Sequence, residues 1–207
     1  MPDRQLRSVT IPEIVLASSS PRRAALLRQI GLPFILSPSQ RPEESAGPDT
    51  DPAARASRLA LAKAQEVAAR HGRGVVIGAD TIVVCEGHVM GKPRTPDEAR
   101  EFLLRLAGRT HQVITGLAVV EAGSGRAEVA ASVTAVRMRP FGPAEAAAYV
   151  ATGEPLDKAG AYAIQGRGAV LVDRIEGDYF NVVGLPLATL TELLRHFGLD
   201  VWEAARP

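Results

Sequence analysis

The segment Ser18–Arg23, which reads Ser-Ser-Ser-Pro-Arg-Arg, combines the residue types and the spacing of an anion-binding site. Ser20 suits a helix N-cap and Pro21 the first helical position, so free backbone N–H groups and the positive end of the helix dipole would point into the loop. Arg22 and Arg23 repel each other and oppose that dipole, a penalty that a bound polyanion would offset. The alternative interpretation is an exposed basic helix start with an ordinary N-cap.

One acid, Asp80, interrupts the apolar run Val75–Val84, which predicts a buried strand. A carboxylate in such a place is costly unless it is paired, hydrogen-bonded or bound to a metal. If the strand ends line a cleft, Asp80 could bind a divalent cation or accept a proton from an attacking water. The alternative is a buried acid that bonds to backbone amides at a strand break.

Two lysines are candidates to bring positive charge into the same cleft. Lys63 shares a helical stripe with Ala60 and Val67, so it emerges from a face that we expect to be buried. Such a lysine either snorkels to solvent or delivers its charge into a cleft. Lys92 follows a turn, and Pro93 stands where a P-loop would need Ser or Thr, which excludes a Walker motif.

The glycine-punctuated segment Gly153–Gly168 is the third dense region. Asp157 and Lys158 could form a surface ion pair of little energetic value. Gln165 could be an ordinary loop residue, but its amide also offers a donor and an acceptor side by side, which would match the imide edge of uracil or thymine.

Composition limits the class of protein. The 207 residues are 46% hydrophobic, enough for a real core, and 24 basic residues nearly balance 23 acidic ones, which argues against a nucleic-acid polymer or an anionic membrane as partner. The single Cys85, expected to be a buried strand residue, is consistent with a reducing compartment, and the absence of an apolar leader or span predicts a cytoplasmic protein. The four histidines have no metal-ligand spacing and are expected on surfaces or caps.

Periodicity predicts alternating strands and helices. Strands are expected at 14–17, 34–36, 75–84, 112–121, 127–138 and 170–175, and helices at 22–30, 52–70, 95–107, 143–151 and 186–197. The region 37–51 reads as a loop, Gly87 as a turn, and Gly123–Gly125 as a hairpin turn. We therefore expect an α/β protein with three layers, in which helices flank a mixed twisted sheet and a cleft separates two lobes. Residues 1–207 would form a single domain with a core of about 13–198.

Four ordered motifs together resemble the Maf family of nucleoside triphosphate pyrophosphatases: Leu16–Arg23, Gly78–Thr81, Gly91–Pro93 and Asp157–Gly166. The resemblance runs from about Ile14 to Phe197. It implies a fold related to the inosine triphosphate pyrophosphatases, a divalent metal, and release of pyrophosphate from a nucleotide. Arg22, Thr81 and Gln165 look like the residues of the dTTP/UTP type rather than those of the 7-methyl-GTP type.

The resemblance also implies a role for each residue. Asp80 would activate water and, with Glu43 or Glu44, hold Mg²⁺ or Mn²⁺. Thr81 and Gln165 would read the pyrimidine. The triphosphate would be held by Ser18, Arg22, Arg23, Lys63 and Lys92. Asp157 and Lys158 would also bind the substrate. A homodimer is implied as well.

Three points stay open: the metal ligand, the range of substrates with their biological role, and whether the chain is an enzyme or a regulator. The acidic pair Glu43–Glu44 is displaced by Gln40–Pro42 from the place where the family usually carries it, so either glutamate could be the metal ligand. Modified pyrimidine nucleotides are further possible substrates, with nucleotide-pool cleansing or cell-division arrest as the biological role. The alternative function is a nucleotide-binding regulator of septum formation with little catalysis, which would need the basic clamp but no water-activating acid.

Overall fold

The computed structural model describes residues 12–41 and 51–204, so Glu43 and Glu44 lie outside the described residues. Seven strands of the described part form one sheet in the order β2-β1-β3-β5-β6-β7, and β4 pairs with β3. The strands are β1 (Ile14–Leu16), β2 (Ile35–Leu36), β3 (Val75–Cys85), β4 (His88–Met90), β5 (Thr110–Glu121), β6 (Ala127–Met138) and β7 (Val172–Glu176). The β1 strand runs parallel to β2 and β3 and the other pairings are antiparallel, which confirms a mixed sheet.

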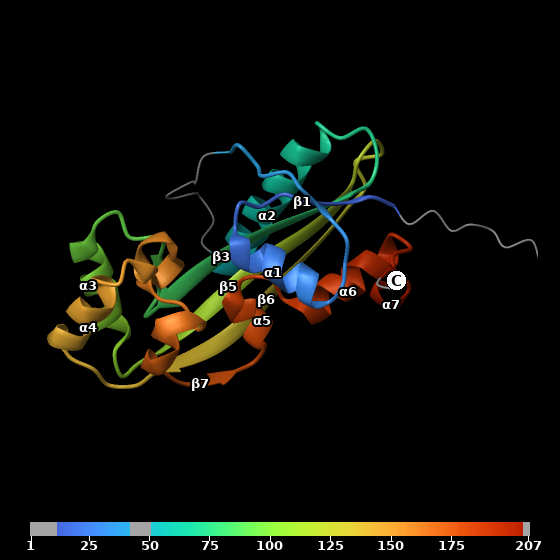
Figure 1. The fold of residues 1–207 in the computed structure, drawn as a ribbon. Coiled ribbons are helices and arrows are strands. Elements are labelled where there is room, and N and C mark those ends of the chain that lie inside the picture. The colour runs from blue at the N-terminus through green and yellow to red at the C-terminus, as the bar shows by residue number, and fades with distance from the viewer. Residues whose placement is uncertain (1–11, 42–50, 205–207) are drawn as a thin grey trace, which may run out of the picture.

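Helices cover both faces of this sheet (Figure 1). They are α1 (Pro21–Gln29), α2 (Pro52–Ala68), α3 (Pro96–Leu106), α4 (Pro143–Val150), α5 (Tyr179–Val183), α6 (Leu187–His196) and α7 (Val201–Ala204), with 3₁₀ turns η1 (Glu154–Asp157), η2 (Ala159–Ala161) and η3 (Gly166–Leu171). Figure 1 shows α2 on one face, α1 and α6 on the other, and α3 with α4 grouped at one end of the long strands. The predicted α/β class with three layers is confirmed. None of the helices within these described ranges is long and apolar enough to cross a membrane.

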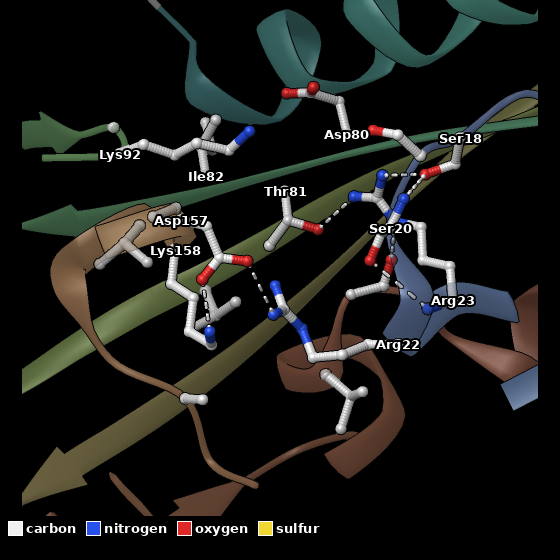
Figure 2. A pocket seen from close by; sticks show the side chains of 18 of the residues that line it. Ser18, Ser20, Arg22, Arg23, Asp80, Thr81, Ile82, Lys92, Asp157 and Lys158 are labelled. Atoms are coloured by element: carbon white, nitrogen blue, oxygen red, sulfur yellow. Dashed lines mark hydrogen bonds and ion pairs between the residues drawn. The ribbon is translucent and has the colours of Figure 1, made fainter. Parts of the chain in front are cut away.

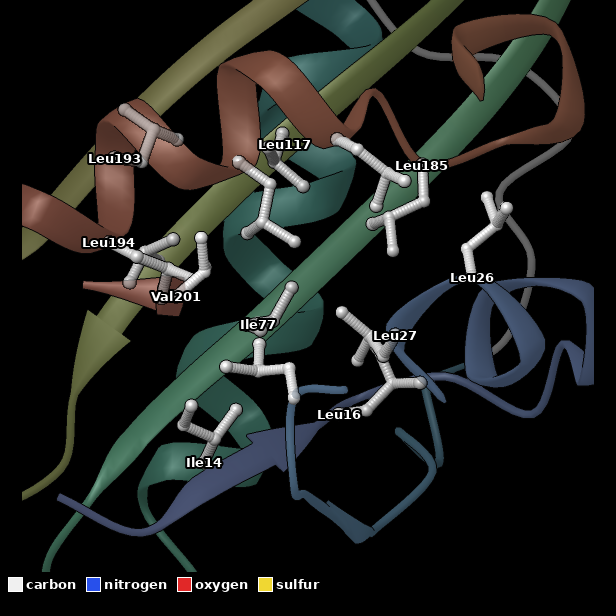
Figure 3. Close-up of a cluster of buried hydrophobic side chains, with 14 of the residues drawn as sticks. Ile14, Leu16, Leu26, Leu27, Ile77, Leu117, Leu185, Leu193, Leu194 and Val201 are labelled. Carbon is white, nitrogen blue, oxygen red and sulfur yellow. The ribbon is translucent and has the colours of Figure 1, made fainter. Parts of the chain in front are cut away.

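Strand alternation distributes the core between the two faces, because successive side chains of a strand point to opposite sides. Val15 and Val76 pack in the cluster beneath α2, whereas Leu16 and Ile77 pack in the larger cluster beneath α1, α6 and α7. Figure 3 shows this larger cluster, in which Leu27 of α1 points toward the strands. A third cluster packs α3 and α4 against the far ends of β3 and β5, and forms the second lobe.

The α2 helix lies unusually close to the sheet because two residues beneath it, one on β3 and one on the paired strand β5, are glycines. A Cβ at Gly116 of β5 would lie 2.1 Å from the backbone carbon of Ala56, and a Cβ at Gly78 would lie 2.3 Å from the carbonyl oxygen of Ala60. The buried face of α2 is built mainly of alanines, which fits the same close contact. Gly116 pairs in register with Asp80, so this contact sets the height of α2 above the acidic residue.

Several boundaries differ from the predictions. The segment after the Gly87 turn returns as β4, a three-residue strand that pairs with β3. The last strand begins at Val172 rather than at residue 170, since η3 occupies the residues before it. The short helices α5 and α7 were not predicted, because four or five residues carry too little periodicity to be recognised. His111 is also a correction: it lies in β5 and is 2% exposed, not on the surface.

Replacing Gly116 by Ala should destabilise the protein, because the new methyl group can fit only if α2 moves away from the sheet. We expect the free energy of unfolding to fall by about 1–3 kcal/mol, the range of overpacked cores. Urea denaturation followed by circular dichroism measures this change. Gly72→Ala is the control, since a Cβ there meets nothing within 4 Å. Equal stability of the two variants would contradict the close contact.

Candidate active site

One cleft of about 860 Å³ gathers the predicted site residues that fall in the described ranges. Its walls come from the start of α1, from α2, from the middle of β3, from the segment after β4 and from the 3₁₀ turns. The predicted residues that line it are Ser18, Arg22, Arg23, Lys63, Asp80, Thr81, Lys92, Asp157, Lys158 and Gln165. Figure 2 shows Asp80 and Lys92 on one side of Thr81, and Arg22, Asp157 and Lys158 on the other.

The start of α1 is organised as its sequence predicts. Ser20 is the N-cap, and its hydroxyl accepts a hydrogen bond from the backbone N–H of Arg23 at 3.5 Å. Ser18 is 6% exposed, and its hydroxyl accepts a bond from the Ser20 backbone N–H at 3.2 Å. These bonds fix the loop so that the first turn of α1 opens into the cleft, where the helix dipole favours an anion.

Arg23 is held on three sides. Its Nε donates to the carbonyl oxygen of Gly184 at 2.8 Å, one terminal nitrogen donates to Ser18 Oγ at 3.1 Å, and the other donates to Thr81 Oγ1 at 3.0 Å. These partners belong to the end of α5, to the loop before α1 and to β3. The guanidinium plane of Arg23 therefore has a fixed orientation in the cleft wall.

The Thr81 hydroxyl has a defined polarity. Thr115 donates its hydroxyl hydrogen to the carbonyl oxygen of Asn181 at 3.1 Å, so in its 2.9 Å bond with Thr81 the donor must be Thr81. Thr81 also accepts a bond from Arg23. A hydroxyl has one hydrogen and two lone pairs, so Thr81 can offer only a lone pair to a ligand.

Lys63 bonds to Asp80 in the cleft. Of the two interpretations, this lysine therefore delivers its charge into the cleft rather than snorkelling to solvent. Its Nζ donates to Asp80 Oδ1, and the two side chains are 19% and 17% exposed. The pair joins α2 to β3, at the register position that faces Gly116. Asp80 is thus a partly buried carboxylate with a cationic partner, and it lines the cleft.

Arg22, Asp157 and Lys158 form a second charged group. Lys158 Nζ donates to Asp157 Oδ1 at 2.5 Å, and Arg22 Nη1 lies 3.8 Å from Asp157 Oδ2. Burial raises the pKa of the Asp157 carboxyl, but the hydrogen bond and charge of Lys158, together with the charge of Arg22, bring the pKa below its usual value. Asp157 therefore stays ionised and bridges the two cations.

The cleft carries far more positive charge than the chain as a whole. Eight basic and only three acidic side chains are among the described residues that line it. Sequence reasoning missed three of the basic ones, Arg41, Arg55 and Arg94, and one of the acidic ones, Glu98. Arg55 could have been found, because it lies eight residues before Lys63 and hence on the same helical stripe. An excess of cations in one cleft attracts a polyanion.

A divalent cation would find oxygen donors of the right chemistry here. Among residues 12–41 and 51–204, no cluster of three or more His, Cys, Asp or Glu side chains could hold a metal by itself. Mg²⁺, however, is usually bound through one or two carboxylates plus the phosphates of a substrate. Asp80 can supply such a carboxylate, so the described residues fit a metal that binds together with a phosphate-bearing ligand.

A hydrogen-bonded pair of buried side chains, His111 of β5 and Tyr162, lies at the wall of the cleft. His111 Nε2 lies 2.7 Å from the hydroxyl of Tyr162, whose side chain lines the cleft. The two rings meet edge to face with their centres 5.3 Å apart. Burial lowers the pKa of His111 to about 4, so this imidazole is neutral at physiological pH.

Comparison with known proteins gives consistent matches along the chain. The family model described as "Maf-like protein" matches residues 13–197. A dTTP/UTP pyrophosphatase of Moorella thermoacetica is 59% identical over 92% of this chain and 97% of its own length. A dTTP/UTP pyrophosphatase of Symbiobacterium thermophilum is 48% identical over 92% of this chain and 96% of its own. A solved dITP/XTP pyrophosphatase of Mycobacterium abscessus aligns with a TM-score of 0.41 and 16% identity, over 62% of this chain and 75% of that one.

Replacing Thr115 by Val should destabilise the fold, because Thr115 is fully buried and its hydroxyl bonds to two partners. The isosteric valine removes the hydrogen-bond partner of the Thr81 hydroxyl and of the Asn181 carbonyl oxygen. Leaving such buried groups unsatisfied should lower the free energy of unfolding by about 1–3 kcal/mol. Thermal and urea unfolding measure the loss. Thr115→Ser keeps the hydroxyl and should lose less than half as much. Equal losses would mean that the methyl group, not the hydroxyl, matters.

The stability of the protein should decrease in mild acid through His111. Its folded pKa of about 4 lies below the ordinary value of 6.5, so between these values the unfolded chain binds a proton that the folded chain does not. The free energy of unfolding should therefore fall by about 2 kcal/mol between pH 7 and pH 5 through this residue. Urea titrations at both pH values measure the fall. His111→Gln serves as the comparison, and identical pH slopes for the two proteins would contradict the assignment.

Proposed function

This chain belongs to the Maf family of proteins, and we propose that it hydrolyses dTTP and UTP to the nucleoside monophosphate and pyrophosphate. The observation that carries the proposal is the cleft itself, where a partly buried carboxylate lies among eight basic side chains. A triphosphate is the small ligand that such a charge distribution favours, and cleavage between its α- and β-phosphates needs a water molecule and a group to accept its proton.

The phosphates would bind at the open first turn of α1 and along the basic side chains. Arg22, Lys63 and Lys92 come from three different elements and line the same cleft. Charge that develops on the leaving pyrophosphate would be stabilised by these fixed cations, since pre-oriented electrostatic partners supply much of the rate enhancement in phosphate chemistry. Arg23 contributes from a fixed orientation, because Ser18, Thr81 and Gly184 hold its guanidinium plane.

Asp80 would accept the proton of the attacking water. Lys63 donates to Asp80 Oδ1, which leaves Oδ2 as the oxygen that takes the proton while the water oxygen bonds to phosphorus. The bond between the bridging oxygen and that phosphorus breaks, and the bridging oxygen leaves with its electron pair as part of pyrophosphate. The hydrogen bond from Lys63 orients the carboxylate for this step.

Gln165 and Thr81 would read the pyrimidine. The amide of Gln165 can pair with the adjacent N–H and C=O of a uracil or thymine ring. Thr81 can offer only a lone pair to a base, so it would oppose an acceptor such as the unprotonated N3 of cytosine. Discrimination by paired polar groups is stronger than discrimination by pocket size alone.

Asp80, with Glu43 or Glu44, would hold Mg²⁺ or Mn²⁺. When bound, such an ion neutralises phosphate charge and lowers the pKa of a coordinated water. A nucleotide substrate is also consistent with a cytoplasmic protein. The homodimer stays a prediction, which sedimentation equilibrium would test.

Asp80→Asn should reduce kcat by at least about 10³-fold, because the amide cannot accept the proton of the attacking water. The measurement is pyrophosphate release from dTTP, UTP, CTP, GTP and 7-methyl-GTP, with Mg²⁺ or Mn²⁺. Asp97→Asn is the matched control, since Asp97 lies in the first turn of α3, is 77% exposed, and pairs with Arg100.

We expect wild type and the Asp97 variant to cleave dTTP and UTP selectively. Full activity of Asp80→Asn would remove Asp80 from its role. If wild type released no pyrophosphate from any nucleotide but still bound dTTP, the protein would instead be a nucleotide-binding regulator.

A further inference from the structure

The segment between α4 and β7 carries three of the proposed ligand-binding residues on a chain with little regular structure. Residues 154–171 form only the short turns η1, η2 and η3, yet they place Asp157, Lys158 and Gln165 along the cleft. Such a segment has no sheet ladder or long helix to hold it. Backbone hydrogen bonds within its turns and one from the Gly160 N–H to the Gly91 carbonyl oxygen hold part of it, and side-chain contacts must hold the rest.

Glu154 supplies the contacts that close this segment on itself. Its Oε1 accepts hydrogen bonds from the Tyr149 hydroxyl at 2.8 Å and from the Gly168 backbone N–H at 2.9 Å. Its Oε2 accepts a bond from the Arg167 backbone N–H at 3.0 Å. The carboxylate at the start of the segment therefore binds the amides that directly follow Gln165 and Gly166.

Glu154 is also linked to the middle of the segment, directly to Lys158 and through Tyr149 to Ala163. The backbone carbonyl of Glu154 accepts a bond from Lys158 Nζ at 2.6 Å. The Tyr149 hydroxyl, which donates to Glu154, accepts a bond from the Ala163 backbone N–H at 3.2 Å. Glu154 and Tyr149 together fix the chain on both sides of Ile164 and Gln165.

The backbone is shaped around this carboxylate. Gly166 has a φ of +71°, and a Cβ at this position would lie 2.7 Å from Glu154 Oε2. Only glycine adopts this conformation at little cost while leaving room for the oxygen. Burial raises the pKa of Glu154, but the bonds from Gly168, Arg167 and Tyr149 and the charge of Lys158 bring it below its usual value, so the acceptor is ionised.

We propose that Glu154 is a positioning residue that sets base selectivity by holding Gln165 at a fixed place in the cleft wall. The inference rests on the proposed function, and specifically on Gln165 as a reader of the pyrimidine. Glu154 is not among the residues that line the cleft. Its loss should therefore weaken recognition of the base while the basic side chains that bind phosphate stay in place.

Glu154→Gln tests the inference with almost no change of shape. The amide oxygen can still accept from Gly168 and Tyr149, but the NH₂ group would face the Arg167 N–H, donor against donor. We expect kcat/KM for dTTP to fall about tenfold, mainly through KM, and the preference for dTTP over dCTP to fall by about the same factor, as for one lost charge-assisted bond. The inhibition constant of tripolyphosphate, a probe without a base, should stay within about twofold.

Glu145→Gln is the matched control. Glu145 is also a carboxylate of the second lobe and forms an ion pair with Arg139, but it does not line the cleft. This variant should keep the wild-type preference between dTTP and dCTP. A preference in Glu154→Gln that stays within twofold of wild type would overturn the proposal, as would an equal loss of affinity for dTTP and tripolyphosphate.

Failure of the proposed function has a different signature. If wild type released no pyrophosphate, the hydrolytic function would be wrong, and dissociation constants for dTTP and dCTP measured by calorimetry would replace KM. A preference that disappears in Glu154→Gln would still support the positioning role. Equal preferences in wild type and variant would overturn it.

Discussion

The close contact between α2 and two neighbouring strand glycines determines where the charges of the cleft meet. Gly78 and Gly116 bring the backbone of α2 almost onto the sheet, and Lys63 on this helix then reaches Asp80 on β3. A larger residue at either glycine would lift the helix by the thickness of a methyl group, and the short ion pair would be lost. Packing of small residues, rather than any property of Lys63 or Asp80 alone, creates the central pair of the site.

The ion pairs of the cleft also show how the protein tolerates so many cations. Asp80 neutralises Lys63, and Asp157 lies between Arg22 and Lys158, but eight basic side chains face only three acidic ones. Repulsion among the like charges gathered in the cleft costs free energy, and desolvation increases that cost. A ligand with several negative charges removes this repulsion and can be drawn into the cleft from solution.

Sequence reasoning found the elements whose signals are local. The N-cap Ser20 with Pro21, the long strand around Asp80 and the hairpin at Gly123–Gly125 need no information from distant residues, and each element forms as predicted. The three-residue β4 depends on pairing with β3, and α5 on its packing between Arg23 and β5. Elements of three to five residues have too little periodicity of their own.

The same limit applies to the site. Motifs identified most of the charged side chains that line the cleft, but not the polar residues behind them. Thr115 is 66 residues from Asn181, and Glu154 is 14 residues from Gly168, so nothing in the local sequence marks either residue as a support. Glu43 and Glu44 lie outside the described residues and stay predictions.

The cleft has two parts, and a different set of hydrogen-bonding residues holds each part in place. Arg23, Thr81 and Thr115 are tied to α5 and to the central strands, and Lys63 with Asp80 depends on α2. The wall that contains Gln165 instead depends on Glu154 and Tyr149, in the second lobe. Because the two groups share no hydrogen bond between their supports among these residues, the wall that contains Gln165 can change its sequence without breaking the bonds that hold Asp80 and Thr81. Under the proposed function, such a fold could alter the contact that Gln165 makes with the base while it keeps the reaction at Asp80.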